Sequence, residues 1–257
     1  MKRYLFLQWT NMKQALFSLK FMIVTLLICC ILFLTVLPAY TSTMDVVGLL
    51  SIGLGGTHGN LMLVLGTLPI IPFAISFATD WEQKVIHPWI IRSGMYPYAT
   101  AKVITSVLSA FLATFFGLSI FELLASIGLP FHLNSYGVEP YMYFIDHDQT
   151  VLYFIFYNTH MALSSFIFAG IAFFVSTMIP NKFVTIAAPV VFYYLSHRFT
   201  STLDIPMYTK ALTIFEGVYN PGTPGESILY KFTTSIIIVA ILSVLSIIQI
   251  RRRMLHA

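Results

Sequence analysis

Residues Phe21–Tyr40 read FMIVTLLICCILFLTVLPAY, and this run contains no charged side chain. About 20 consecutive apolar residues in a helix are enough to cross the hydrocarbon core of a bilayer. The whole chain has a similar character, because 58% of its 257 residues are hydrophobic and only 9% are charged. Soluble domains carry about 25% charged residues, so the composition favours a membrane protein.

Six apolar runs of this kind occur in the chain: Phe21–Tyr40, Asn60–Thr79, Lys102–Ile127, Val151–Ile179, Phe183–Arg198 and Ile228–Ile250. The fifth run is short, and the second holds Pro69 and Pro72, which predict a kink near its middle. Polar and apolar residues do not alternate as they do in membrane β-strands. Backbone groups in lipid must bond within their own segment, so we predict an all-α fold. We expect a polytopic membrane protein with six transmembrane helices in one transmembrane domain over 1–257.

Basic residues gather on one side of the predicted spans. If the N-terminus is cytoplasmic, 11 of the 14 lysines and arginines fall on inner segments: Lys2, Arg3, Lys13, Lys20, Lys84, Arg92, Lys102, Lys182, Arg251, Arg252 and Arg253. Cytoplasmic loops carry such an excess, so we predict that both termini are cytoplasmic. The net charge of +4 then needs no nucleic-acid partner.

Residues 1–20 have the pattern of an amphipathic helix. Leu5, Trp9, Met12 and Leu16 gather on one face at 100° per residue, and lysines lie at the edge of that face. Such a helix lies in the membrane interface rather than crossing it. The alternative is a basic flank that only orients the first span.

Residues 80–102 read DWEQKVIHPWIIRSGMYPYATAK and form the longest polar interval that this orientation places in the cytoplasm. Pro88 can open a short helix, and Gly94 and Pro97 can end it. We expect a cytoplasmic coupling loop whose short helix docks a soluble partner; the alternative is an ordinary solvated loop. The predicted partner-docking residues are Asp80, Glu82, Trp89, Ile90, Ile91 and Arg92. We expect Asp80 and Glu82 to pair with Lys84 or Arg92 of the same loop.

Three polar side chains inside the predicted spans are candidates for a transport pathway: Glu122, Asn158 and His160. An intramembrane carboxylate is costly and therefore a functional candidate, although Glu122 is also near enough to the span end to reach the outer headgroups. His160 is either a reactive group or a bundle histidine with its bonds satisfied. The run 146–148 (Asp-His-Asp) is too short for a metal site, which needs about three or four ligands.

Two outer segments differ in character. Residues Thr41–Gly59 are rich in glycine, and we expect a flexible loop there. Residues 199–227 combine an apolar string with Pro206, Pro221 and Pro224. This segment is too short to cross and too apolar for a free loop, so we predict a re-entrant outer segment.

These features together resemble the membrane subunit of a bacterial ABC exporter of the ABC-2 permease type. The likeness covers nearly the whole chain as an architecture. Its most specific part is Phe77–Glu82, followed by Ile90–Gly94 and Tyr98–Lys102, which resemble the acidic, then Arg-containing, then Tyr-and-Lys-ending loop of bacterial members. Those members often have Gly a few residues after the acid, where this chain has Val85–Pro88.

The resemblance implies a multi-pass permease subunit in a bacterial plasma membrane. Two such subunits, as a homodimer or heterodimer, would form the pathway, and separate cytoplasmic ABC ATPase subunits would bind ATP and Mg and drive export. No G-x-x-x-x-G-K-[ST] occurs in the chain, so a P-loop ATPase site is not expected in it. The family suggests an amphipathic or hydrophobic cargo, such as a peptide, an antibiotic or a lipid-like compound.

Two alternatives come from other classes. One is a polytopic membrane enzyme or intramembrane protease that uses His160, Glu122 or the run 146–148, although neither H-E-x-x-H nor G-x-S-x-G occurs. The other is a non-transporting immunity or sensor subunit of the same fold.

Overall fold

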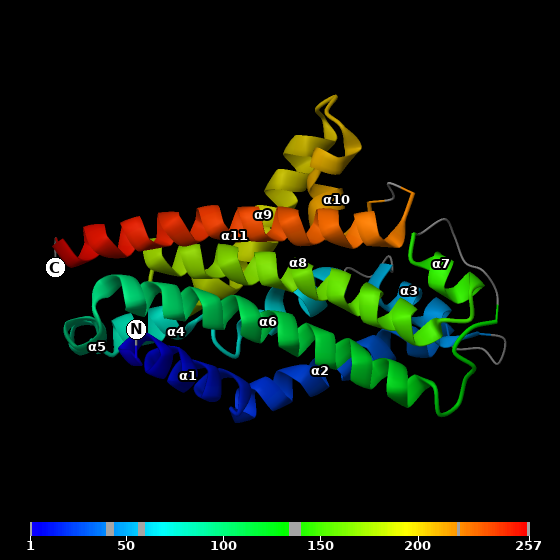
Figure 1. The fold of residues 1–257 in the computed structure, drawn as a ribbon, viewed down its shortest axis with the longest axis horizontal. Helices are drawn as coiled ribbons and strands as arrows, with labels where there is room; N and C mark the ends of the chain where they lie inside the picture. The colour runs from blue at the N-terminus through cyan, green and yellow to red at the C-terminus, as the bar shows by residue number, and fades with distance from the viewer. Residues whose placement is uncertain (1, 40–43, 56–59, 134–139, 220–221, 256–257) are drawn as a thin grey trace.

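The computed structural model describes residues 2–39, 44–55, 60–133, 140–219 and 222–255 (Figure 1). All regular secondary structure within these ranges is helical, which confirms the predicted all-α fold. Four of the described helices are long and apolar enough to cross a membrane: α2 (Leu19–Val36), α6 (Met95–Ala125), α8 (Thr150–Met178) and α11 (Pro224–Leu255). The chain is therefore a multi-pass membrane protein.

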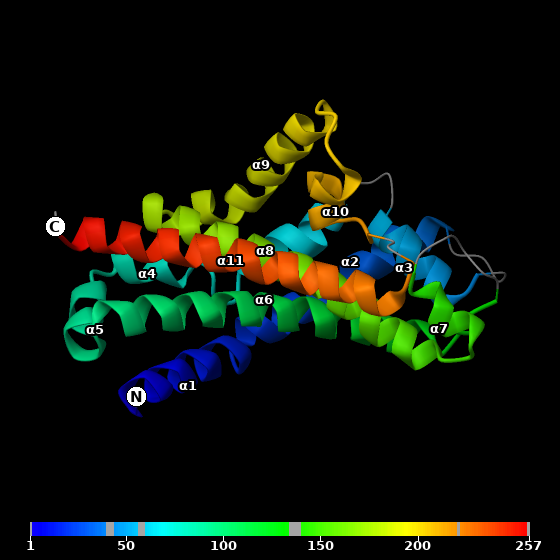
Figure 2. The ribbon, with the colours of Figure 1, turned by 45° about the horizontal axis from the view of Figure 1, so that its top comes forward.

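The bundle has two distinct ends. Both termini lie at one end together with α4 (Ser76–Glu82) and α5 (Ile86–Ser93), and we call this the terminal end (Figures 1 and 2). The distal end carries α3 (Val46–Gly55) and α7 (Met142–Asp146). Helix α8 is central, because it packs against α6, α9 (Lys182–Ser201) and α11, and α2 packs on the other side of α6.

The second predicted span is broken rather than kinked. Residues Met62–Thr67 form the π-helix η2, Leu68–Ile70 form the 3-10 helix η3, and turns lead to α4. The N–H of Leu68 bonds the carbonyl of Leu63, five residues back. Pro69 and Pro72 lack the N–H that an α-helix needs and clash with its preceding turn, and two such prolines three residues apart favour a break here.

The fifth predicted span corresponds to α9, a helix of 20 residues that contains Pro189. Asn181 caps its start, because its Oδ1 accepts from the N–H groups of Phe183 and Val184 at 2.9 and 3.2 Å. Helix α9 leaves the bundle obliquely (Figure 2) and is not among the four membrane-length apolar helices. The chain then turns through η4 (Met207–Thr209) and α10 (Ala211–Phe215), where the ring of Phe215 stacks on Phe168 at 5.0 Å.

The N-terminal helix α1 (Lys2–Leu16) packs along α6. Leu7, Asn11 and Ala15 are buried in this contact, while Phe6 and Trp9 on other faces are exposed. Ser18 separates α1 from α2 and caps the latter, since its Oγ accepts from the N–H of Phe21 at 3.1 Å. The chain thus presents an exposed apolar face on α1 outside the bundle.

The expected flexible loop Thr41–Gly59 contains an ordered helix, so this expectation was wrong for residues 46–55. Helix α3 is buried, and Asp45 anchors its start: Oδ1 accepts from the N–H of Gly48 and Oδ2 from the N–H of Leu133, both at 2.7 Å. The carboxylate supplies the cap that the helix start needs. Residues 41–43 and 56–59 of the loop lie outside the described residues.

Candidate functional site

The short helix α5 projects at the terminal end of the bundle (Figure 1). It starts at Ile86, two residues before Pro88, and ends at Gly94, whose N–H bonds the carbonyl of Ile90 at 2.8 Å. Gly94 has φ of +84°, a conformation that glycine adopts without a steric penalty. The predicted short helix and its glycine stop are therefore confirmed, whereas Pro88 does not open the helix and Pro97 lies in the first turn of α6.

The predicted docking residues on α5 face different ways. Ile86 is buried and Ile90 is half-buried against the same cluster, so these two side chains hold the helix on the bundle. Ile91 is 84% exposed and Trp89 37%, and Arg92 is also exposed. No carboxylate of the described residues pairs with Arg92. Trp89 and Arg92, one turn apart, thus expose an aromatic and a cationic side chain on one side of α5, and Ile91 is exposed on another side.

A recess lies beside this helix. It has a volume of about 260 Å³ and is lined by Trp81, Lys84, Ile86 and His87. Lys84 occupies the sharp turn between α4 and α5 with φ of +56°, and the N–H of Val85 returns to the carbonyl of Asp80 at 3.0 Å. This tight turn connects α4 directly to α5, and the recess lies on the surface of the two helices.

Asp80 pairs with neither Lys84 nor Arg92, the two partners that we had expected. Its Oδ2 lies 2.9 Å from Lys102 Nζ, and the hydroxyl of Tyr98 donates to the same oxygen at 2.7 Å. The Asp80 side chain is 15% exposed and that of Lys102 9%. Lys102 Nζ also lies 5.0 Å from the ring centre of Phe73. The pair is largely desolvated, and it ties α4 to the first turns of α6.

Two further contacts tie α4 to other helices. Glu82 Oε2 lies 2.6 Å from Nζ of Lys182 at the start of α9, in a pair that is about 40% exposed on each side. The guanidinium of Arg253 lies 5.0 Å from the ring centre of Trp81. Arg253 also donates to the carbonyls of Thr177, at 2.7 Å, and Met178, so it caps the end of α8 from α11. Helix α4 therefore contacts α6, α9 and α11 through three consecutive residues.

Glu122 and Asn158 lie together between α6 and α8. Asn158 Nδ2 donates to Glu122 Oε2 at 2.8 Å and to Ser119 Oγ at 3.3 Å. Glu122 is 5% exposed and Asn158 1%. Of the two readings of Glu122, the structure disfavours the one in which it reaches the headgroups, because Asn158 holds the carboxylate inside the helix pair.

His160 lies on a different face of α8 from Asn158, because two residues turn a helix by about 200°. Its Nε2 lies 3.1 Å from the carbonyl of Gly217, and its Nδ1 lies 2.9 Å from the hydroxyl of Tyr141. A carbonyl only accepts, so Nε2 carries the proton and Nδ1 accepts from the tyrosine. Both ring nitrogens are satisfied, which favours the bundle-histidine reading over a reactive group.

Sequence reasoning missed Lys231. It lies inside the predicted run Ile228–Ile250 but was not among the candidate residues; it is 1% exposed in α11 and donates to the carbonyl of Ile214 in α10 at 2.6 Å. Together with the bond from His160 to Gly217, this contact holds α10 and the residues that follow it against α8 and α11. A lysine in the second turn of a long apolar run is the signal that could have identified it.

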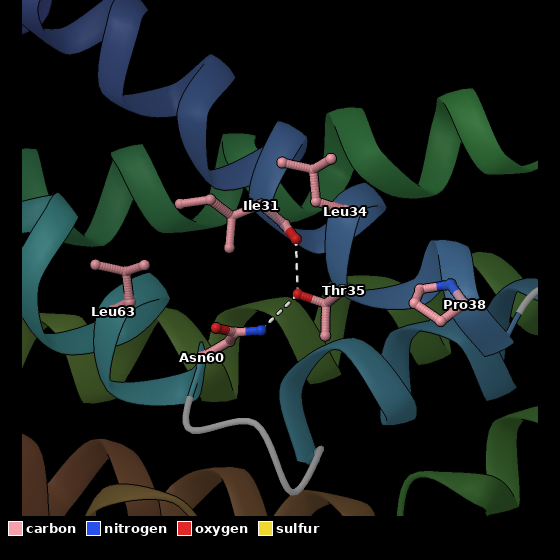
Figure 3. Close-up of a pocket in the computed structure, with 6 residues that line it drawn as sticks. All are labelled: Ile31, Leu34, Thr35, Pro38, Asn60 and Leu63. Carbon is pink, nitrogen blue, oxygen red and sulfur yellow. Dashed lines mark hydrogen bonds between the residues drawn. The ribbon is translucent and has the colours of Figure 1, made fainter.

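A cavity of about 410 Å³ lies between α2 and the broken second run (Figure 3). Its lining is apolar apart from Thr35 and Asn60. Asn60 Nδ2 donates to Thr35 Oγ1 at 2.6 Å, and that hydroxyl donates to the carbonyl of Ile31 at 2.7 Å (Figure 3). These bonds use the threonine hydroxyl within the protein, so we assign no ligand to the cavity.

The described residues contain no group of three or more His, Cys, Asp or Glu side chains that could hold a metal ion. Comparisons with protein-family models, with curated proteins and with solved structures found no match for this chain.

Proposed function

We propose that the chain is the membrane-spanning permease subunit of an ATP-driven ABC exporter. The observation that carries the proposal is α5, which presents Trp89, Ile91 and Arg92 at one end of the bundle while buried Ile86 anchors it. Aromatic and arginine side chains supply most of the energy in protein interfaces. A cytoplasmic ABC ATPase subunit would dock here and would bind the ATP and Mg.

The contacts of α4 suggest how such a partner moves the spans. A displacement of α5 passes to α4 through their tight turn. It then reaches α6 through the Asp80–Lys102 pair, α9 through Glu82–Lys182 and α11 through the Trp81–Arg253 contact. Packed helices shift as rigid bodies between discrete arrangements. In this mechanism ATP binding in the partner would move these helices together and alternate inward and outward states.

Six spans remain part of this proposal. The chain returns from α3 at the distal end to α4 at the terminal end through η2 and η3, and α9 leads away from the end of α8 (Figure 2). We assign these two segments as the second and fifth spans, beside the four long helices. Broken helices are tolerated at membrane depth where neighbouring protein buries them, and Val64, Leu65 and Ile70 are fully buried.

We place the terminal end in the cytoplasm of a bacterial cell. It carries Lys84, Arg92, Lys182 and Arg251–Arg253 in the described structure, and such an excess of basic residues is typical of the cytoplasmic side. A second permease subunit, identical or different, would complete the pathway. The cargo we propose is amphipathic or hydrophobic.

The direct test is capture of a cytoplasmic ABC ATPase subunit from the chain's own cell by the tagged, full-length chain in detergent. We expect Trp89→Ala and Arg92→Ala each to weaken capture at least about 10-fold, because truncating an interface anchor costs about 2 kcal/mol. Tyr143→Ala and Arg198→Ala change exposed residues of similar kinds outside α5 and serve as matched controls. Unchanged capture and unchanged cargo-stimulated ATP hydrolysis in both α5 variants would refute the docking role.

A further inference from the structure

The recess beside Glu122 contains two buried acceptors to which no described residue donates a hydrogen bond. Glu122 Oε1 and Asn158 Oδ1 have no hydrogen-bond partner among the described residues, although both atoms are buried. The amide nitrogen of Asn158 donates its two N–H groups to Ser119 and to the other oxygen of Glu122. A buried acceptor without a partner costs about 1–3 kcal/mol, and more when it is charged. Both oxygens are therefore free to accept hydrogen bonds from a donor outside the described residues.

Both residues line a cavity of about 220 Å³ between α6 and α8. It lies in the halves of these helices nearer the distal end (Figure 1). Its remaining walls are Phe115, Ser119, Leu123, Phe131, Val151, Phe154 and Ile155. Leu123 and Val151 at its mouth are 66% and 72% exposed, so the cavity opens sideways onto an apolar surface.

The chemistry of this cavity selects a cationic donor. A carboxylate and an amide oxygen accept hydrogen bonds, and the aromatic rings of Phe115, Phe131 and Phe154 attract a cation over their faces. Two oxygen atoms are too few for a dedicated metal site, since Ca²⁺ takes six to eight oxygen ligands. A protonated amine satisfies both oxygens and neutralises the buried carboxylate.

The size of the cavity limits how much of the ligand enters. Sites that enclose drug-sized molecules have volumes of roughly 300–1,000 Å³, and this one holds about 220 Å³. It accepts a small head group and its first carbon atoms. The rest of an alkyl chain would lie along the exposed side chains of Leu123, Val151 and Ile155.

We infer that this recess binds amphiphiles with a primary or secondary ammonium head, whose alkyl chain lies on the lipid-facing side of α6 and α8. Such a head belongs either to a bilayer lipid of the phosphatidylethanolamine type or to an amine-bearing cargo. As a cargo site it rests on the proposed function, but binding itself requires neither ATP nor a partner.

The test is saturable binding of radiolabelled dodecylamine to the full-length chain in phosphatidylcholine nanodiscs, with empty nanodiscs subtracted. Competition by unlabelled amphiphiles on the unmodified chain shows whether binding needs the positive charge, the N–H donor, or both. Dodecanol keeps a donor without the charge, and dodecyltrimethylammonium keeps the charge without an N–H. We expect both to compete at least about 10-fold more weakly than dodecylamine, as for loss of a charge-assisted hydrogen bond.

Glu122→Gln removes the charge at nearly constant volume and turns an amide N–H₂ toward the recess or toward Asn158. We expect at least about a 10-fold loss of dodecylamine affinity. Glu226→Gln makes the same change at an exposed carboxylate on the first turn of α11 and should leave binding unchanged. Equal competition by all three amphiphiles, or equal affinity of Glu122→Gln and the original chain, would overturn the inference.

A competition experiment with lipid shows whether the ammonium head group comes from a bilayer lipid or from a single-chain amine. If phosphatidylethanolamine added to the nanodiscs displaces dodecylamine, the recess is a lipid site; if it does not, the recess selects single-chain amines. Capture of the ATPase is a separate measurement, so failure of amine binding leaves the docking role standing, and failure of capture leaves the amine site standing.

Discussion

The Asp80–Lys102 pair offers the sharpest test of how the terminal end is held together. Lys102→Met removes the cation while keeping most of the side-chain length, and leaves Asp80 with the hydroxyl of Tyr98 alone. Breaking a buried ion pair by removing one partner costs about 3–5 kcal/mol. Asp80 is 15% exposed, so water compensates in part, and we expect the lower end, about 3 kcal/mol.

This cost corresponds to a measurable shift in unfolding temperature. One kcal/mol lowers the midpoint by roughly 2–4 °C in a chain of about this size, so Lys102→Met should melt roughly 6–12 °C lower. Thermal unfolding of the purified chain in detergent, followed by far-UV circular dichroism, measures it. The matched control is Glu82→Gln, which breaks an exposed pair that should contribute about 0–1 kcal/mol.

The double variant Asp80→Leu with Lys102→Met shows whether the lower melting temperature of Lys102→Met comes from the unpaired buried charge or from lost packing. Replacing a buried ion pair by apolar residues of similar volume is often neutral in stability. The hydroxyl of Tyr98 also loses its acceptor, which lowers the free energy of unfolding by about 1 kcal/mol. The double variant should therefore melt closer to the original chain than either single change. A Lys102→Met shift no larger than that of Glu82→Gln, or simple additivity in the double variant, would refute the reasoning.

Two further outcomes are expected. With Cys29 and Cys30 replaced by serine, a cysteine at position 204 should react with an impermeant thiol reagent in intact cells and one at position 93 only after permeabilisation; labelling of position 93 in intact cells would reverse the proposed orientation. Gly117→Ala should destabilise the α2–α6 contact by about 1–3 kcal/mol, because a Cβ there would lie 2.7 Å from Ile28 Cγ2. The matched change Gly225→Ala meets no atom within 4 Å, so similar melting of these two variants would contradict the packing argument.

Local chemistry made several features predictable. The long apolar runs gave the membrane class and four membrane-length helices, because a helix satisfies its own backbone within lipid. Gly94 ended α5 as expected, since the stop depends on one residue's backbone freedom. The separation of His160 from Asn158 also follows from helix periodicity, although we had grouped them with Glu122 as one pathway.

Other features had no local signal. The polar groups of Asp80 and Glu82 found partners 22 and 100 residues away in the chain, Lys102 and Lys182, rather than the nearby Lys84 or Arg92. Helix α3 was missed because its ten residues are short for a span and contain glycines, and its order depends on burial and on the Asp45 cap. Lys231 was not singled out, because its acceptor, the carbonyl of Ile214, belongs to α10 and is brought to it only by the fold.

The sequence by itself determined that this protein lies in a membrane and that its secondary structure is helical. Both properties depend on the polarity of successive side chains within one segment. Only the tertiary structure decided which buried polar groups satisfy one another and which remain unpaired. Asn158 reaches Glu122 because α6 and α8 lie side by side, and the same packing leaves an oxygen of each without a partner among the described residues. Hydrogen bonds act over about 3 Å, so this outcome depends on how helices distant in the chain approach each other.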